Sequence, residues 1–263
     1  MTSKMKCVVA LVFALPALSA GVAFAADSDA QADGPPGSGV EDEDCSRLPQ
    51  GSERVSLERD DFVASIDNPY FPLAPGSEWI YRETDAEGNE QRVVVTVTDR
   101  QKKILGISAT VVRDTVTEDG ELVEDTWDWY AQDECGNVWY LGEDTKEYEN
   151  GEVVSTAGSW QAGVDRAQAG IIMPGDPEVG LAYRQEYYAG EAEDAAEILS
   201  LDERVKVPYG SFRGVLQTKD FTPLDPELLE HKFYAKGVGN VLVVDVAGGG
   251  GRQELLSFVK GGS

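Results

Sequence analysis

The chain has 263 residues, of which 48 are acidic and 22 basic, and 41% are hydrophobic. That apolar fraction is ordinary for a chain that folds around a buried core, so wholesale disorder is excluded. Lys4 and Lys6 fall within the first 25 residues, which leaves 20 basic against 48 acidic residues in the remainder and a formal charge of −28. Because this charge has the wrong sign for phosphate, no nucleic acid and no anionic membrane is expected as a partner.

The N-terminus has the parts of an export signal. Lys4 and Lys6 precede an apolar run over residues 7–18, and small residues at Ala23 and Ala25 frame a cleavage point after Ala25. The run is shorter than the roughly 20 apolar residues that cross a bilayer, and no later segment reaches that length. We therefore expect a signal peptide over residues 1–25 and a soluble exported protein, extracellular or periplasmic, with no membrane span.

Residues 26–55 are rich in Asp, Glu, Gly, Pro and Ser and hold few apolar side chains. Because such a segment buries too little surface to offset the entropy of ordering, we expect a flexible acidic leader. A single β domain over residues 56–263 is expected to follow it. Cys45 and Cys135 remain after processing, and an oxidising compartment permits a disulfide between them, with two free thiols as the alternative.

Short segments rich in Val, Thr, Tyr and Trp alternate with turn signals from residue 56 onward. Asp119-Gly120 and Asn150-Gly151 are the strongest signals, because a two-residue hairpin turn needs positive φ, which Asp, Asn and Gly tolerate. This pattern predicts a β-meander. Its first five strands are expected at residues 78–83, 91–98, 109–117, 122–131 and 138–142.

The pattern lapses after Trp160. Residues 169–181 contain two prolines and three glycines and are expected to form a packed loop. Residues 191–199 place alanines and a leucine at helical spacing, which predicts at most one short helix, with a strand as the alternative. Further strands are expected at residues 183–188, 204–207, 212–219, 230–235, 241–246 and 254–259.

About eleven short strands over some 200 residues favour a mainly β fold. We expect a single antiparallel meander that curls into an open or half barrel. A sandwich of two sheets is the alternative.

Several unusual strings occur in order along the chain: IDNPYFPL at 66–73, DWYAQD at 128–133, GNVWYLGEDTKEY at 136–148 and VPYGSF at 207–212. Together they resemble a recurrent family of uncharacterised secreted bacterial proteins. The resemblance implies export and a single domain, and it supplies no reaction, ligand or catalytic residue. A more distant likeness, carried by residues 76–81 and 234–239, is to half-barrel lipid carriers of the bacterial envelope and concerns architecture alone.

The single histidine, His231, excludes sites that need two histidine ligands within one subunit. Ser211 is the nearest approach to a strained nucleophile turn, but Gly214 falls one place late for that motif, and a strand follows where a helix is required. The glycine run at residues 248–251 also lacks the helix that a nucleotide-binding loop needs. No catalytic residue is assigned, and the sequence favours a protein that is not an enzyme.

A divalent cation such as calcium is the alternative hypothesis. Glu193 and Asp194, together with Glu230 and His231, could supply oxygen and nitrogen ligands, for binding alone or for a metal-dependent extracellular enzyme. No aspartate-rich calcium loop is present, and among 48 acidic residues such clusters also arise as a solvated face. No cofactor is predicted from the sequence alone.

Aromatic residues carry the leading hypothesis. Trp127 and Trp129 alternate with aspartates and so share one face of a strand, and Tyr187 and Tyr188 lie on a later strand. Such surfaces line ligand grooves, although the same residues also make a good core. We expect a secreted, non-enzymatic β-barrel that binds a small apolar or amphipathic ligand with these four side chains. The identity of the ligand and the oligomeric state are left open.

Overall fold

The structure is a computed structural model that describes residues 45, 47–248 and 250–262. The expected signal peptide and most of the expected leader therefore lie outside the described residues. Within them the chain forms fifteen strands and one short 3-10 helix, η1 (Arg59–Asp61), and no α-helix. The prediction of a mainly β fold is confirmed.

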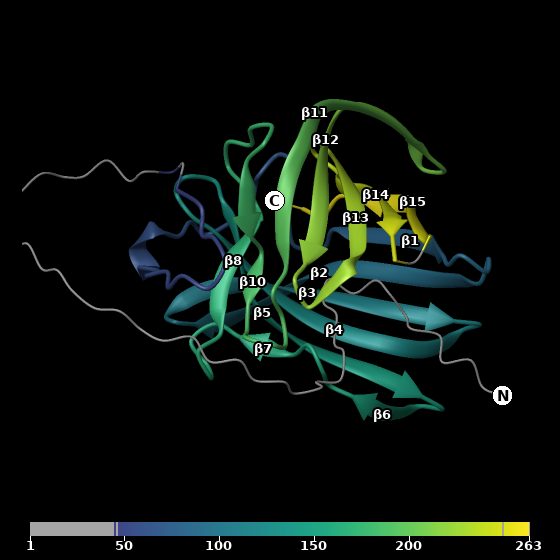
Figure 1. The fold of residues 1–263 in the computed structure, drawn as a ribbon, viewed down its shortest axis with the longest axis horizontal. Coiled ribbons are helices and arrows are strands. Elements are labelled where there is room, and N and C mark those ends of the chain that lie inside the picture. Colours follow the sequence, from purple (N-terminus) through teal and green to yellow (C-terminus); the bar gives the residue numbers. More distant parts are fainter. Residues whose placement is uncertain (1–44, 46, 249, 263) are drawn as a thin grey trace, which may run out of the picture.

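All the strands belong to one antiparallel sheet (Figure 1). The first arm of the sheet contains β1 (Glu78–Thr84), β2 (Glu90–Ile104), β3 (Ile107–Glu118), β4 (Glu121–Gln132), β5 (Val138–Glu149), β6 (Glu152–Ser155), β7 (Trp160–Gln161), β8 (Gln168–Met173) and β10 (Glu186–Tyr187). The second arm contains β9 (Ala182–Arg184), β11 (Ala195–Val207), β12 (Gly210–Thr222), β13 (Asp225–Ala235), β14 (Gly239–Ala247) and β15 (Arg252–Val259). The two arms join where β1 pairs with β15.

The sheet curves strongly but does not close into a barrel. Its hydrogen-bonded order runs from β10 through β1 and β15 to β9, and these two edge strands do not pair with each other. Only Gln185 separates β9 from β10 along the chain, and its N–H donates to the carbonyl of Asp194 at 2.7 Å. Figure 1 shows β11–β13 lying across β2–β4, so the two arms face each other around a shared interior.

The two hairpin turns with the strongest sequence signals are confirmed. Asp119 and Gly120 have φ angles of 51° and 86°, and Asn150 and Gly151 have φ angles of 54° and 79°. Both pairs lie in the left-handed region, where Gly, Asn and Asp cost little. Each pair connects two antiparallel strands, β3 to β4 and β5 to β6.

One sequence prediction is wrong, and one open choice is decided. Of the two alternatives for residues 191–199 the strand is observed and the short helix is not, because β11 begins at Ala195 and buries Ala196 and Ile198 on alternate positions. The expected loop after residue 168 contains β8, whose residue Ile171 pairs with Trp139 of β5. In both places pairing with neighbouring strands overrides a local preference that was weak from the start.

The expected strand at residues 183–188 is split by a bend at Gln185. The residues before the bend pair with β11, and the residues after it pair with β8. The bend changes the alternation, so that Tyr183 and Glu186 are both fully buried although they are three residues apart. The chain therefore crosses from one edge of the sheet to the other within this segment.

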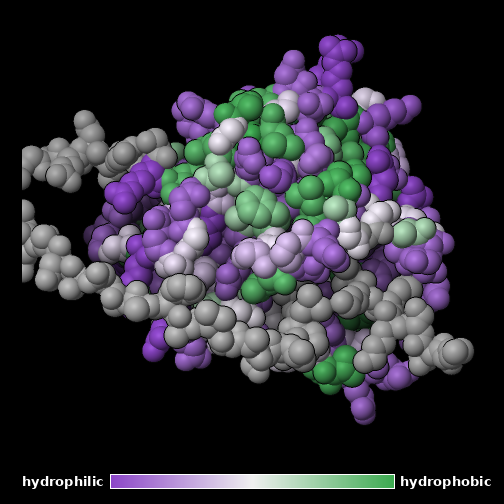
Figure 2. Space-filling view, in the orientation of Figure 1, coloured by the Kyte–Doolittle hydropathy of each residue, from purple (hydrophilic) through white to green (hydrophobic). Residues whose placement is uncertain are grey.

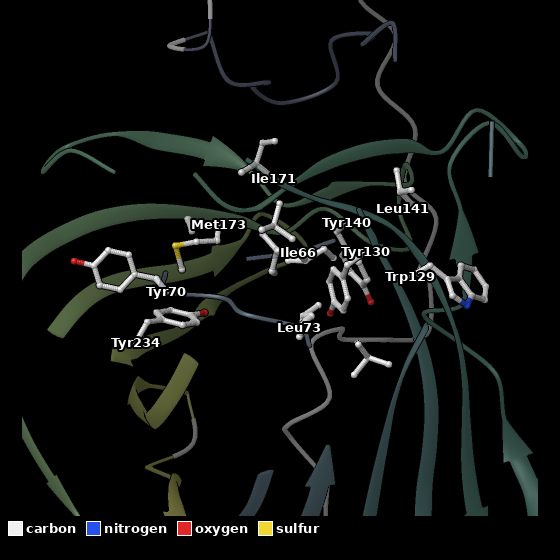
Figure 3. Packing of buried hydrophobic residues seen from close by; sticks show 14 of the residues in the cluster. Ile66, Tyr70, Leu73, Trp129, Tyr130, Tyr140, Leu141, Ile171, Met173 and Tyr234 are labelled. Atoms are coloured by element: carbon white, nitrogen blue, oxygen red, sulfur yellow. The ribbon is translucent and has the colours of Figure 1, made fainter. Parts of the chain in front are cut away.

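The segment that contains the string IDNPYFPL packs across one end of the interior. Figure 3 shows Ile66 and Leu73 among the buried side chains of the sheet, beside Tyr130 and Tyr140. The side-chain amide of Asn68 donates to the carbonyls of Gly136 and Pro174, at 3.0 and 2.9 Å. This string is thus explained by packing and by hydrogen bonds that anchor the segment.

The outer surface mixes polar and apolar side chains. Figure 2 shows apolar side chains gathered in the upper half of this view, where β11–β13 lie. Tyr209 and Phe221 are among the large hydrophobic residues exposed on the protein. Across the described ranges, no helix has the length and apolar character needed to cross a membrane.

Cys45 and Cys135 form a disulfide that spans 90 residues of sequence. Leu48 and Pro49, which follow Cys45 closely, are already buried. The guanidinium of Arg184 donates to the carbonyls of Gly51 and Glu53, each at 2.7 Å. Ordered contacts therefore begin before residue 56, within the segment that the sequence suggested as leader.

Replacing Cys45 and Cys135 together by serine is expected to lower the free energy of unfolding by about 2–4 kcal/mol, because the disulfide restricts a long loop of the unfolded chain. The residues between Cys45 and Leu57 are also expected to become the first site of proteolysis. Urea unfolding and limited proteolysis followed by mass spectrometry measure the two effects. Unchanged stability and an unchanged cleavage pattern would contradict this role of the disulfide.

Candidate functional site

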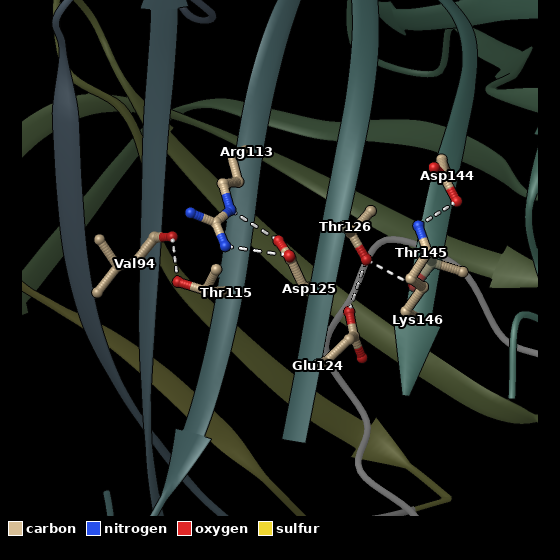
Figure 4. A network of polar contacts seen from close by, with 9 residues as sticks. All are labelled: Val94, Arg113, Thr115, Glu124, Asp125, Thr126, Asp144, Thr145 and Lys146. Carbon is tan, nitrogen blue, oxygen red and sulfur yellow. Dashed lines mark hydrogen bonds and ion pairs between the residues drawn. The ribbon is translucent and has the colours of Figure 1, made fainter. Parts of the chain in front are cut away.

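The concave face of the sheet carries polar side chains at positions where strand alternation turns them inward. On β4, the hydroxyl of Thr126 donates to Glu124 at 3.0 Å and lies 2.6 Å from the hydroxyl of Thr145 on β5. Arg113 and Asp125 form an ion pair at 2.7 Å on the opposite face of the same strands (Figure 4). The arrangement thus separates an inner from an outer polar network.

Neighbouring strands continue the inner network around the interior. Its members are buried or partly buried carboxyls, the tyrosines near them, and one ammonium group, that of Lys232. The carboxyls are Glu83, Asp114, Glu124, Asp128, Glu143, Glu186, Asp194, Asp220 and Glu230, and the tyrosines are Tyr81, Tyr130, Tyr140, Tyr183 and Tyr234.

A cavity with a volume of about 100 Å³ lies between the two arms of the sheet. One part of its wall is apolar and aromatic, and includes Phe71, Leu73, Trp79, Val95, Val112 and Val243. The other part is polar, and includes Asp114, Asp128, Glu230, Lys232, Asn240 and Gln253. The cavity therefore has the mixed lining that is typical of small-molecule sites.

Lys232 is paired with two carboxylates at this site. Its Nζ lies 3.2 Å from Asp220 Oδ2 and 3.4 Å from Glu230 Oε2, and all three side chains are at most 10% exposed. Burial by itself lowers the pKa of Lys232, but the attraction of Asp220 and Glu230 outweighs burial and raises this pKa well above its ordinary value. Lys232 is thus charged, and its charge is balanced by these two partners.

Several of the inward carboxyls are held partly in the protonated form near neutral pH. Burial, helped by the repulsion of nearby carboxyls, raises the pKa of Glu83 to about 8 and that of Glu124 to about 7. Burial likewise raises the pKa of Asp128 to about 7, although Asp128 accepts a hydrogen bond from Tyr140 at 2.7 Å. The pKa of Asp114 lies well above its ordinary value for the same reason.

Three buried oxygens of the cavity lining have no hydrogen-bond partner among the described residues. They are Asp114 Oδ1, Asn240 Oδ1 and Gln253 Oε1. Gln253 is only 6% exposed, so water from the surface does not reach its amide freely. A buried acceptor without a donor costs free energy, and such groups mark places where a bound molecule supplies the missing donor.

Glu143 and Glu186 form a second inward carboxyl group away from the cavity. Glu186 Oε2 accepts the indole N–H of Trp160 at 2.7 Å, whereas both carboxyl oxygens of Glu143 lack a partner among the described residues. Burial first, and mutual repulsion second, raise the pKa of Glu143 well above its ordinary value. Both effects favour the protonated, neutral form of Glu143.

Trp127 and Trp129 face away from the cavity. The guanidinium carbons of Arg100 and Arg113 lie 4.9 and 5.1 Å from the ring of Trp127, and Nζ of Lys102 lies 3.0 Å from the ring of Trp129. Figure 3 shows Trp129 pointing away from Tyr130, its neighbour on β4. The indoles thus line the outer face of β4, and the structure does not place them against the cavity.

Tyr187 and Tyr188 also lie outside the cavity lining. Tyr187 follows the inward residue Glu186, and the guanidinium of Arg184 lies 6.0 Å from its ring. Tyr188 is half-buried and packs against the apolar core. The aromatic residues that do line the cavity are Phe71, Trp79, Tyr81, Tyr130 and Tyr234.

The four residues suggested for a metal are not brought together. Glu230 faces the interior, whereas its neighbour His231 faces the opposite side, where its Nδ1 lies 2.9 Å from the amide of Gln217. Glu193 accepts the N–H of Gly190 in a turn, and Asp194 is buried near Lys232. Over the described ranges, no group of three or more His, Cys, Asp or Glu side chains is placed to hold a metal ion.

The polar residues of the cavity were not predicted from the sequence. Glu124 and Asp128 lie on β4 at even spacing, opposite the face of Trp127 and Trp129, and this pattern was the available signal. Carboxylates usually mark the solvent face of a strand, and aromatic rings the core face. On β4 the arrangement is the opposite, because the carboxyls lie on the concave, inward face and the two tryptophans on the other face.

Neither a family model nor a curated protein matches the chain. A presumed exported protein with a YmcC-like fold from Bacteroides fragilis is 14% identical, with a TM-score of 0.43 over 73% of this chain and 100% of that chain. A presumed lipoprotein from Parabacteroides distasonis is 12% identical, with a TM-score of 0.37 over 73% of this chain and 99% of that chain. This chain resembles both proteins in fold alone.

Proposed function

We propose that the protein is a non-enzymatic binding protein that holds a small amphipathic molecule on the concave face of its open, half-barrel sheet. The observation that carries the proposal is the cavity between the arms, whose lining sets apolar and polar side chains side by side, as at Val95 of β2 and its partner Asp114 on β3. A molecule with an apolar body and a polar end matches both kinds of side chain at once. The site lies where the two arms face each other, so both arms contribute contacts.

The size of the cavity limits the ligand. A volume of about 100 Å³ is small beside the space that drug-sized ligands occupy. A dry cavity of about 150 Å³ admits a benzene molecule. Because this cavity is smaller, we expect a ligand of at most one ring with a short substituent, of which only a part lies within the enclosed volume, or a longer chain of which only the end enters.

Binding without catalysis is favoured by the positions of the residues that were considered for hydrolysis. His231 faces away from the cavity, and Ser211 is exposed at the start of β12. The disulfide between Cys45 and Cys135 is typical of an oxidising compartment, which supports a role outside the cytosol.

Val95→Phe is expected to abolish ligand binding, because a ring at this position fills the cavity that Val95 lines. The probes are benzyl alcohol, benzylammonium and benzoate, which share one ring and differ in charge. Ligand-observed NMR titration of the mature protein measures the dissociation constants. We expect at least one probe to bind the wild type and not the variant, with a stability cost of about 1–3 kcal/mol from overpacking.

Val94→Phe is the matched control, because Val94 is the preceding residue of β2 and faces the other side of the sheet, where Thr115 donates to its carbonyl. This variant is expected to bind the same probes as the wild type. If Val95→Phe fails to fold, the smaller change Val112→Leu on β3 tests the same point. Absence of binding by all three probes, or equal binding by wild type and a folded cavity-filling variant, would contradict the proposed function.

A further inference from the structure

The cavity presents unpartnered acceptors to a ligand, whereas two donors of its aromatic lining are already occupied. The unpartnered buried atoms of the lining are the side-chain oxygens of Asp114, Asn240 and Gln253. In contrast, the indole N–H of Trp79 donates to the carbonyl of Val238 at 2.7 Å, and the hydroxyl of Tyr81 donates to the carbonyl of Asn240 at 3.0 Å. A ligand that completes this site must therefore bring hydrogen-bond donors.

The charged groups at the cavity also favour a ligand that brings donors. Lys232 is balanced by Asp220 and Glu230, at 3.2 and 3.4 Å. The remaining carboxyls of the lining, Asp114 and Asp128, have no cationic partner among the described ion pairs. Burial raises the pKa values of both carboxyls. A cation bound beside them would stabilise their ionised forms and lower these pKa values, whereas an anionic ligand would disfavour ionisation further.

The aromatic part of the wall is also suited to a cation. Trp79, Tyr81 and Tyr130 line the cavity, and the faces of such rings attract ammonium groups. An ammonium carries three donors and no acceptor, so it can donate to an unpartnered oxygen such as Asp114 Oδ1 without adding an acceptor of its own. A bare metal ion fits less well, because the described residues place no three His, Cys, Asp or Glu side chains together to hold one.

We infer that the ligand of this cavity is a small organic cation, an ammonium group carried on a compact apolar body. The inference rests on the proposed function, since it names the chemical class of the molecule that the same cavity binds. The ammonium lies at Asp114, and the apolar body packs against the valines beside it, Val112 on the same strand and Val95 paired with Asp114 on β2.

Titration with the three isosteric probes tests the sign of the charge. Benzylammonium is expected to bind the mature protein at least about tenfold more tightly than benzyl alcohol, the scale of one hydrogen bond to a charged group. Benzoate is expected not to bind. Equal binding of benzylammonium and benzyl alcohol, or tighter binding of benzoate, would overturn the inference while leaving the proposed function in place. Binding by none of the three would overturn both.

Asp114→Asn tests the residue that the inference uses, because the change removes a carboxyl that can ionise beside a bound ammonium and preserves the size. We expect it to weaken benzylammonium binding about tenfold and to leave benzyl alcohol binding unchanged. Asp119→Asn is the matched control, since it removes a carboxyl from the exposed turn of the same hairpin, where Asn tolerates the positive φ. The control is expected to bind both probes as the wild type does.

Gln253→Leu provides a second variant if Asp114→Asn does not fold. It removes an unpartnered acceptor without changing the charge of the protein. The expected result is again a selective loss of benzylammonium affinity. If both probes weaken equally in the folded variants, or if Asp119→Asn weakens benzylammonium as much as Asp114→Asn does, the ammonium does not lie at this wall and the inference fails.

Discussion

Lys232→Met is expected to lower the free energy of unfolding by about 3–5 kcal/mol at neutral pH. The change leaves Asp220 and Glu230, which are paired across β12 and β13, without the ammonium that lies between them. Two buried carboxylates without a cation repel each other and stay poorly solvated. The loss is expected to be smaller near pH 5, because burial raises the pKa of Glu230 and this carboxyl can then take up a proton. Urea unfolding at both pH values measures the difference.

Lys219→Met is the control, because Lys219 lies on the same sheet but its side chain is 37% exposed and pairs with the equally exposed Glu197 at 3.4 Å. An exposed pair of this kind contributes at most about 1 kcal/mol. Similar small losses for both variants would show that Lys232 does not hold the interior carboxyls together.

The free energy of unfolding is expected to fall as the pH rises from 5 to 8, the reverse of ordinary acid denaturation. The folded protein holds the pKa of Glu83 at about 8 and those of Asp128 and Asp194 at about 7, above the ordinary values of 4.5 for glutamate and 3.8 for aspartate. The folded state therefore keeps protons that the unfolded state has lost. Each such carboxyl makes the free energy fall by about 1.4 kcal/mol per pH unit between its two pKa values.

Thermal unfolding across this pH range measures the effect, and the highest melting temperature is expected near pH 5. Glu83→Gln is expected to make the fall in the free energy of unfolding less steep by about 1.4 kcal/mol per pH unit between pH 4.5 and about 8. It removes a group whose pKa is raised by burial and by Asp245 and Glu230. Glu121→Gln, at an exposed position beside the β3–β4 turn, is expected to leave the slope unchanged. A melting temperature that rises with pH would contradict the assignment of protonated carboxyls to the interior.

Local chemistry made much of the fold predictable. The hairpins at Asp119-Gly120 and Asn150-Gly151 follow from residues that tolerate positive φ, and most expected strands are present within the observed ones. The error at β8 and the choice left open at the start of β11 concern segments with prolines, glycines or alanines. In these segments the intrinsic preference is weak, and pairing with β5 or β12 decides the conformation.

The candidate site was much less predictable than the fold. Alternation on β4 correctly separated Trp127 and Trp129 from Asp128. A period-two pattern defines two faces of a strand, but it does not say which face becomes concave. Likewise, no local pattern brings Asp114 of β3 and Gln253 of β15 to one cavity, because they are far apart in the sequence. The curvature of the whole sheet places them there.

The sequence by itself determined the period-two strands, the tight turns, the acidic charge and the predicted export signal, since each depends on residues close together in the chain. The tertiary structure decided that the carboxyls line the interior, that Lys232 is paired within it and that Trp127 and Trp129 lie on the opposite face of β4. The physical reason is that burial, which sets the pKa of a carboxyl and the need of an oxygen for a donor, arises only when the two arms of the sheet face each other.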